Sequence, residues 1–257
     1  MLNPIVNTLD TLRTTLLTGL LKAASNNSKN GYASVRLFEV GSVFDAQRNE
    51  SLKMALLLCG DRELQSLSNA GKPSKVDFAF FAQKLSNIIG SFELREFATK
   101  HTLSHPYQCA EIFIDGVCMG EMFRLHPNVE ESFDLDTTYM CELDFEKLPY
   151  ALKTAKTTSR YQASFRDLSV VMPKNMPYEK VKDVISACAI QELVRFYPVD
   201  KYSDAVLGEN MSFSIRFVLQ SNDKTLEEED ITNAMDFAFW REHCGIALGV
   251  SAVRQVG

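Results

Sequence analysis

The second half of the chain shows a regular succession of strand-like and helix-like patterns. Its strand-like segments alternate apolar and polar residues with a period of two, as half-buried strands do, or form short apolar runs. These segments are residues 167–172, 192–199, 212–217 and 246–248. Helical patterns lie between the first two segments and between the last two. The resulting order of strand, helix, strand, strand, helix, strand predicts a ferredoxin-like βαββαβ domain.

Both predicted helices of this half have a recognisable start and an apolar stripe. Pro177 suits the first turn of one helix, because proline lacks an amide hydrogen that this turn would leave unpaired. Thr225 and Glu228 predict a capping box at the start of the other. The expected buried stripes are Val181, Val184, Ile185, Cys188 and Ala189 in the first helix, and Ile231, Ala234, Met235, Ala238 and Phe239 in the second.

Helical patterns in the first half predict three helices. Apolar residues at helical spacing indicate an N-terminal helix, which the polar segment 25–31 should end. A second amphipathic helix is predicted over 76–89, and a short one after His126, with Pro127 in its first turn. The expected buried faces are Leu9, Leu12, Leu16, Leu20 and Ala23 in the first helix, and Phe78, Phe81, Leu85 and Ile88 in the second.

Strand patterns in the first half predict an antiparallel sheet. Asp115-Gly116 between apolar segments is typical of a type I′ turn and predicts a hairpin over 112–120. Residues 61–75 are polar and are expected to form a loop. The other predicted strands are 35–40, 51–59 and 139–143.

Length and composition indicate a soluble globular chain with room for two domains. The chain has 257 residues, of which 46% are hydrophobic and 23% charged. We expect a domain over 1–150, a linker over 151–163 rich in threonine, lysine and alanine, and a second domain over 164–257. The apolar runs are too short to span a bilayer, and the start of the sequence lacks the features of a signal peptide. These properties predict a cytoplasmic protein.

The sequence contains no recognisable catalytic or metal-binding motif. Its six cysteines and four histidines lack the spacing of zinc ligands. Glycine-rich phosphate loops and the G-x-S-x-G pattern are also missing. We therefore expect no metal ligands and no catalytic residues, and we expect Cys59, Cys118 and Cys141 to be buried, reduced thiols.

The charge of the chain disfavours a protein that binds duplex DNA through its backbone. The net charge is −6 and the isoelectric point about 5.3, and there is no basic stripe of the kind that such proteins use. One local exception is the segment 151–166, which has four basic residues and no acidic one. These residues are Lys153, Lys156, Arg160 and Arg166.

A series of short motifs runs through both halves of the chain. In order, the motifs are Asn3-Pro4, 12–21, 36–44, Gly120-Glu121, 126–129, 141–144, 165–171, 199–202, 211–217 and 225–228. Each motif alone is weak, but their order along the chain resembles the bacterial phenylalanyl-tRNA synthetase β-subunit family over nearly the whole sequence. That family has further modules on the N-terminal side, so we expect this chain to correspond to the C-terminal part of the subunit.

The resemblance implies an α+β chain: a class II synthetase-like antiparallel sheet with flanking helices, followed by the ferredoxin-like βαββαβ domain. In the family, the first block supports a catalytic α subunit in an (αβ)2 heterotetramer, which ligates phenylalanine to tRNA(Phe) with ATP and magnesium. Arg36 lies where class II enzymes place an ATP-contacting arginine, but no G-x-G-x-E-R signature accompanies it. We therefore expect this chain to form no adenylate and to bind no cofactor.

The resemblance also assigns anticodon contacts to six residues of the second half. These are Arg166, Asp167, Ser169, Asp200, Tyr202 and Ser212. Such a set suits an unpaired RNA loop, because a tyrosine ring can stack on a base and a carboxylate can accept hydrogen bonds from guanine. The phenylalanine anticodon begins with guanine, so Asp200 would supply specificity and Tyr202 affinity. The chain departs from the family pattern at Val199, Asp204 and Met211, around the loop 203–211.

Two other interpretations remain open from the residues alone. The chain could be a stand-alone binding or regulatory protein, because the ferredoxin-like fold hosts many functions. It could also be an uncharacterised enzyme, although the missing catalytic motifs disfavour that interpretation. Large exposed apolar patches on residues 1–150 would favour a subunit scaffold over a stand-alone protein.

Overall fold

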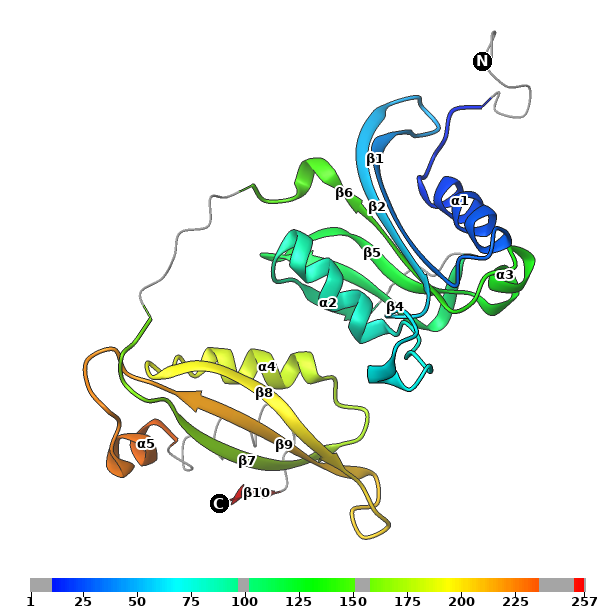
Figure 1. Ribbon diagram of the computed structural model, residues 1–257. Helices are drawn as coiled ribbons and strands as arrows, with labels where there is room; N and C mark the ends of the chain where they lie inside the picture. The colour runs from blue at the N-terminus through cyan, green and yellow to red at the C-terminus, as the bar shows by residue number, and fades with distance from the viewer. Residues whose placement is uncertain (1–10, 97–101, 151–157, 236–251, 257) are drawn as a thin grey trace. The chain divides into compact units, whose positions relative to one another are not determined.

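A computed structural model of the chain describes residues 11–96, 102–150, 158–235 and 252–256. The chain divides into two compact units, Met1–Ala151 and Leu152–Gly257, hereafter unit 1 and unit 2. Both combine an antiparallel sheet with helices (Figure 1), so the predicted α+β class is confirmed. No helix within the described ranges is long and apolar enough to cross a bilayer.

Unit 1 is built on a six-stranded sheet in the order β1-β2-β6-β5-β4-β3, with every neighbouring pair antiparallel. The strands are β1 Ser34–Phe44, β2 Glu50–Gly60, β3 Glu93–Glu96, β4 Ser104–Ile114, β5 Val117–Leu125 and β6 Thr138–Asp144. The predicted hairpin is confirmed, because Asp115 and Gly116 join β4 to β5 with positive φ angles of 50° and 78°, as a type I′ turn requires. The sequence patterns did not predict β3.

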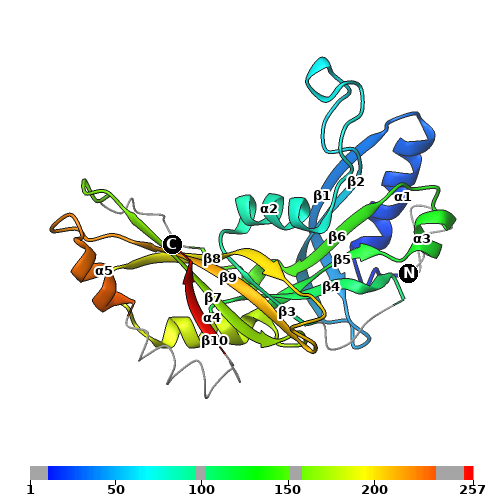
Figure 2. The same ribbon diagram turned by 90° about the horizontal axis from the view of Figure 1, so that it is seen from below.

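Helices cover both faces of this sheet. Helices α1 (Leu17–Lys29) and α3 (Pro127–Ser132) pack on one face, and α2 (Phe78–Ile89) packs on the other (Figure 2). The sequence of β2 is a continuous apolar run rather than an alternation, because both faces of this strand are buried. Its odd-numbered residues 55, 57 and 59 enter the core beneath α1, and its even-numbered residues 54, 56 and 58 enter the core beneath α2.

The predicted bounds of the first helix were wrong at both ends. Helix α1 begins at Leu17 and continues to Lys29, through most of the polar segment that was expected to end it. Ser25 is buried in this segment and donates a hydrogen bond to the Phe133 carbonyl at 2.6 Å, so a tertiary contact holds the last turns. Gly31, at φ 88°, follows the helix. The prediction for Leu12 was wrong, because it precedes the helix and is 40% exposed. Leu9 lies outside the described residues.

The other predicted helices and thiols of unit 1 are mostly confirmed. Phe81 and Leu85 of α2 are fully buried, but the prediction for Ile88 was wrong, because its side chain is 57% exposed at the end of the helix. Cys59 and Cys141 are buried as expected, and burial raises the pKa of the Cys141 thiol to about 12. The prediction for Cys118 was wrong: it is exposed, two residues after Gly116 of the hairpin turn.

Unit 2 has the strand order β10-β7-β9-β8, which is the ferredoxin-like order. Its elements are β7 Ser164–Pro173, α4 Tyr178–Ala187, β8 Leu193–Tyr202, β9 Asn210–Leu219, α5 Glu228–Ala234 and β10 Ala252–Val256. Both helices contribute to one core on one face of the sheet, in which Val181 and Ile185 of α4 and Ile231 of α5 meet alternate residues of β7 and β9. Unit 2 therefore has the predicted βαββαβ succession.

Three local predictions for unit 2 differ from the structure. The capping box of α5 is formed by Glu227 and Asp230, two residues after the predicted one, so the helix starts later. Ala189 lies beyond α4 and has a positive φ of 48°, so it is not part of the helical stripe. The strand expected at 246–248 lies outside the described residues, as do Ala238 and Phe239; the strand beside β7 is Ala252–Val256.

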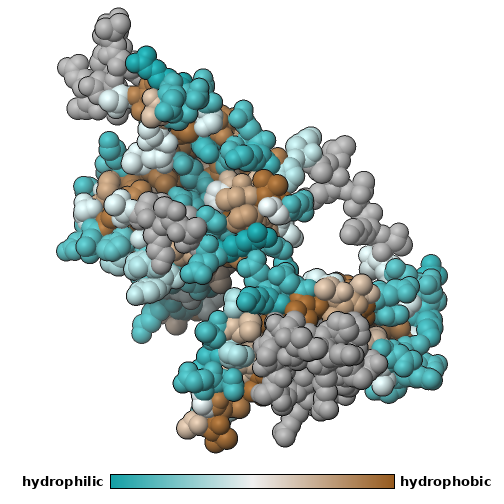
Figure 3. All heavy atoms as spheres, turned by 180° about the vertical axis from the view of Figure 1, so that it is seen from behind, coloured by the Kyte–Doolittle hydropathy of each residue, from teal (hydrophilic) through white to brown (hydrophobic). Residues whose placement is uncertain are grey.

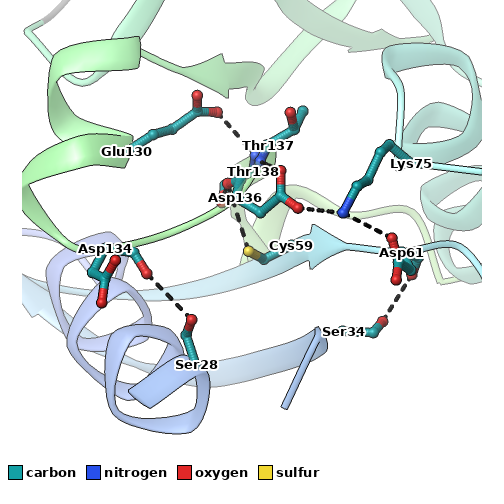
Figure 4. Close-up of polar contacts among 10 residues, drawn as sticks. All are labelled: Ser28, Ser34, Cys59, Asp61, Lys75, Glu130, Asp134, Asp136, Thr137 and Thr138. Carbon is teal, nitrogen blue, oxygen red and sulfur yellow. Dashed lines mark hydrogen bonds and ion pairs between the residues drawn. The ribbon is translucent and has the colours of Figure 1, made fainter. Parts of the chain in front are cut away.

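A polar network closes one edge of unit 1 around the turn before β6 (Figure 4). Glu130 is only 7% exposed, and its carboxylate accepts hydrogen bonds from the Thr138 amide at 2.9 Å and from Arg124 at 3.1 and 3.3 Å. Lys75 pairs with both Asp61 and Asp136, which joins the loop 61–75 to the same turn. Glu130 is thus the buried acceptor that neutralises Arg124 and satisfies an amide of β6.

We predict that Glu130→Ala destabilises unit 1 by about 2–3 kcal/mol, because it leaves a buried amide and a guanidinium without their acceptor. Urea unfolding, followed by hydrogen exchange of the β6 amides, measures this effect. Glu131→Ala is the matched control, since Glu131 is an exposed neighbour on the same helix. Equal stability of the two variants would contradict the role given to Glu130.

Candidate nucleic-acid interface

The sheet of unit 2 presents a polar face on the side away from its core, here called the outer face. Alternate residues of β7 and β9 enter the core, so the residues between them lie on the outer face. The strand register arranges these residues in three rows across β8, β9 and β7. Row one is Tyr202, Ser212 and Val171; row two is Asp200, Ser214 and Ser169; row three is Tyr197, Arg216 and Asp167.

A β-bulge in β8 makes these rows possible. Tyr197 and Asp200 are three residues apart and would point to opposite faces of a regular strand. The pairing of β8 with β9 shifts between Pro198 and Asp200, so Val199 is an extra residue without a partner opposite. The bulge therefore places Tyr197, Asp200 and Tyr202 on the same face.

Row three contains a bidentate ion pair between β7 and β9. The Nε and Nη2 atoms of Arg216 each donate to a carboxylate oxygen of Asp167 at 2.7 Å. The hydrogen bonds from Arg216 hold the pKa of Asp167 below its usual value, and the same carboxylate raises the pKa of Arg216. Tyr197 lies beside this pair, with the Arg195 guanidinium 5.4 Å from the centre of its ring. Together with Arg195, the row thus combines an aromatic ring with two guanidinium groups and one carboxylate.

Row two combines a carboxylate with two hydroxyl groups. The Ser169 and Ser214 hydroxyl groups hydrogen-bond to each other at 2.6 Å. Asp200 is exposed, and its Oδ1 accepts a hydrogen bond from the Lys201 amide at 2.8 Å, which orients the carboxylate on the strand. The row-two carboxylate is therefore held in place and open to solvent.

Tyr202 is held by the loop that follows it. Its ring is 55% exposed, and its hydroxyl donates to Asp204 at 3.0 Å. This hydrogen bond to a carboxylate raises the pKa of Tyr202. Asp204 also accepts a hydrogen bond from the Leu207 amide at 2.9 Å, which is the main reason that its own pKa is lowered. Asp204, one of the departures from the family pattern, thus fixes the direction of the tyrosine ring.

The structure brings together five of the six residues that the sequence singled out. Asp167, Ser169, Asp200, Tyr202 and Ser212 all lie on the outer face. Arg166 lies elsewhere: it is opposite Phe217 of the core in the register, and it pairs with Glu228 of α5 at 2.5 Å, on the helix-covered side of the sheet.

Sequence reasoning missed two residues of the outer face, Tyr197 and Arg216. A signal for Arg216 was present, because it alternates with core residues in the same period as Ser212. Nothing in the local sequence indicated that Tyr197 shares this face, since its position depends on the bulge.

The chemistry of the outer face suits unpaired nucleotides. Exposed aromatic rings can stack on bases, guanidinium groups can bind phosphates or base edges, and a carboxylate can accept from the donors of guanine. In the parts of the chain that the structure describes, no cluster of three or more histidine, cysteine or acidic side chains could hold a metal ion.

Comparison with known proteins agrees with this chemistry. Residues 159–239 match the family described as a ferredoxin-fold anticodon binding domain, and residues 1–145 match the phenylalanyl tRNA synthetase beta chain CLM domain. These two matches place the chain in the aminoacyl-tRNA synthetase class. Because the second of these matches covers more than half of its length, the chain belongs to the phenylalanyl-tRNA synthetase β-chain family.

Individual relatives support the same assignment. The chain is 74% identical over 236 residues to the phenylalanine–tRNA ligase beta subunit of Sulfurimonas denitrificans, and 39% identical over 236 residues to that of Campylobacter jejuni. Each alignment covers 92% of this chain and 30% of the relative, so the chain spans less than a third of these relatives. Among solved structures, a pyrrolysyl-tRNA synthetase from Desulfitobacterium hafniense aligns with the chain at a TM-score of 0.37 and 16% sequence identity. The alignment covers 53% of this chain and 48% of the synthetase chain.

We predict that the pKa of Asp167 lies below 3.8 in the folded chain and rises when Arg216 is replaced by glutamine, because the bidentate donor is lost. The ion pair stabilises the folded state above the unfolded pKa of Asp167, and this stabilisation is lost as the pH falls through the lowered folded pKa. Carboxyl NMR titration measures both values. Arg195→Gln is the control and should leave the pKa of Asp167 unchanged, since Arg195 contacts the Tyr197 ring instead.

Proposed function

We propose that this chain is the C-terminal part of a phenylalanine–tRNA ligase β subunit and that unit 2 reads the anticodon of tRNA(Phe). The observation that carries the proposal is the outer face, where five residues expected to contact the anticodon lie together. The family match of residues 159–239 supports it. The chain is then a non-catalytic part of an enzyme that works in the cytoplasm.

Guanine in the first anticodon position would be held by rows one and two. Its ring stacks on the exposed face of Tyr202, and its N1 and N2 groups donate to the Asp200 carboxylate. The two groups are adjacent on the face, because Ser212 and Ser214, their partners on β9, are two residues apart. Few phosphate contacts are needed for this recognition, which agrees with the net charge of −6.

We predict that Asp200→Asn removes the preference of the chain for guanine over adenine at the first anticodon position. Asparagine retains one acceptor oxygen and gains a donor, so affinity for the guanine loop should fall by about tenfold and affinity for the adenine loop should change little. Fluorescence anisotropy with the two anticodon stem-loops measures both affinities. Asp183→Asn, an exposed carboxylate of α4, is the control and should retain the preference. An unchanged preference in Asp200→Asn would contradict the role of this carboxylate.

For unit 1 we propose a scaffold that supports the catalytic α subunit in an (αβ)2 assembly. Its surface carries apolar groups beside hydrophilic ones (Figure 3), and Phe38 and Ile88 are 76% and 57% exposed. These two side chains line a groove of about 340 Å³ between β1, β2 and α2. Exposed apolar surface of this kind favours a subunit with a partner over a stand-alone regulatory protein.

ATP and magnesium would be used by the whole synthetase and not bound by this chain. Arg36 lies where class II enzymes place an ATP-contacting arginine, and it donates a hydrogen bond to the Arg62 carbonyl. It is exposed on the same face of β1 as Phe38, where it lines the groove beside α2. Neutralising the charge of an activated phosphate needs several converging donors, and a single arginine with another partner does not supply them.

We predict that the chain alone catalyses no ATP–pyrophosphate exchange above background in the presence of phenylalanine. The assay uses radiolabelled pyrophosphate, with Arg36→Ala run in parallel. Exchange that depends on phenylalanine and falls in Arg36→Ala would overturn the non-catalytic assignment.

A further inference from the structure

The outer face carries a second tyrosine that guanine recognition by rows one and two does not use. We propose that row three, formed by Tyr197, Arg216 and Asp167 with Arg195 beside them, is a second nucleotide subsite, which binds a neighbouring unpaired nucleotide of the same RNA loop. The proposal rests on the proposed function of unit 2 and extends it to a particular set of side chains.

The spacing of the rows fits consecutive nucleotides. Rows on one face of a strand repeat every second residue, or about 6.8 Å, so Ser212 of row one and Arg216 of row three are about 14 Å apart along β9. The sugar–phosphate repeat of one extended nucleotide has a length comparable to one row. A loop whose guanine occupies Tyr202 and Asp200 therefore brings another nucleotide to row three.

The groups of row three can bind both parts of a nucleotide. Bases stack on tyrosine rings and on guanidinium planes, and the Arg195 guanidinium lies over the Tyr197 ring as a stacked pair of these two groups. Arg216 uses its Nε and Nη2 atoms for Asp167, and its guanidinium also hydrogen-bonds to the Tyr197 hydroxyl. Because a guanidinium has five N–H donors, donors remain for a base edge or a phosphate. Because Asp167 already fixes the guanidinium, RNA binding costs little side-chain entropy there.

Charge distinguishes the two ends of the face. Row three with Arg195 has two guanidinium groups and one carboxylate, whereas row two has a carboxylate and two hydroxyl groups. A phosphate is therefore attracted to row three and repelled by Asp200. This polarity favours an RNA backbone at row three over an apolar peptide of a protein partner, for which the hydroxyl groups and paired charges of the face offer little apolar contact.

The test measures how the chain binds fluorescein-labelled anticodon stem-loops that carry a single abasic site at each loop position in turn. Tyr197→Leu should weaken binding of the intact loop by about tenfold, because one stacked base is lost. Tyr197→Phe should retain most of the binding, because it keeps the ring and loses only the hydroxyl that contacts Arg216. When the base that stacks on Tyr197 is the one removed, Tyr197→Leu should no longer weaken binding. The loop position at which this happens should differ from the position at which Tyr202→Leu no longer weakens binding.

Arg216 and a matched control complete the experiment. Arg216→Gln should weaken binding several-fold and lower the slope of log affinity against log salt by about 0.7, because one phosphate contact is lost. Tyr32→Leu, an exposed tyrosine of unit 1, should bind all RNAs as the wild type does.

The outcomes separate the two proposals. Weak binding by Tyr202→Leu and Asp200→Asn together with wild-type binding by Tyr197→Leu would overturn the second subsite and leave anticodon reading intact. The second subsite would also be overturned if Tyr197→Leu lowered the affinity equally for every abasic RNA. The same holds if its effect vanished at the loop position where the effect of Tyr202→Leu vanishes. No RNA binding by the wild-type chain, or protein binding that these RNAs do not compete with, would overturn both proposals.

Discussion

The pairing of β9 with both β7 and β8 is the constraint on which the chemistry of unit 2 depends. On one side of β9, Met211, Phe213, Ile215 and Phe217 are buried in the core. Burying one such side chain stabilises the fold by roughly 1.5–3 kcal/mol. A register slip of one residue would exchange these side chains for Ser212, Ser214 and Arg216. The core therefore fixes the rows of the outer face, which needs no stabilising contacts of its own to keep its geometry.

This constraint also decides which residues of the outer face can be predicted from the sequence. Alternation along β9 correctly indicates that Arg216 shares a face with Ser212, because every second residue of a regular strand does so. The same rule separates Arg166 from Asp167: adjacent residues of β7 point to opposite faces, so a motif that names both cannot describe one surface. Tyr197 could not be placed, because the bulge at Val199 is decided by pairing with β9 and leaves no local signature in the sequence.

The start of α1 shows a similar limit in unit 1. Leucine spacing extends the helical pattern upstream of Leu17, but polar side chains of the sheet hold the chain before it in another conformation. Glu142 of β6 accepts hydrogen bonds from the Thr15 hydroxyl at 2.8 Å and from the Leu16 amide at 2.7 Å. Arg13 donates to the Ser42 carbonyl at 2.7 Å and pairs with Glu39. Because these partners are 26 to 127 residues away in sequence, periodicity within the segment could not reveal them.

Asp204, at which the chain departs from the family pattern, determines which part of Tyr202 is available to RNA. An acidic side chain beside a nucleic-acid site has a cost, because it repels phosphate. Here the carboxylate is occupied by the Leu207 amide and the Tyr202 hydroxyl. The hydroxyl that donates to Asp204 is not free to read a base, while the ring is held in one direction with its surface exposed. Tyr202 is thus arranged for stacking, which tolerates any base, and discrimination must come from the edge-reading groups of the neighbouring row, above all Asp200.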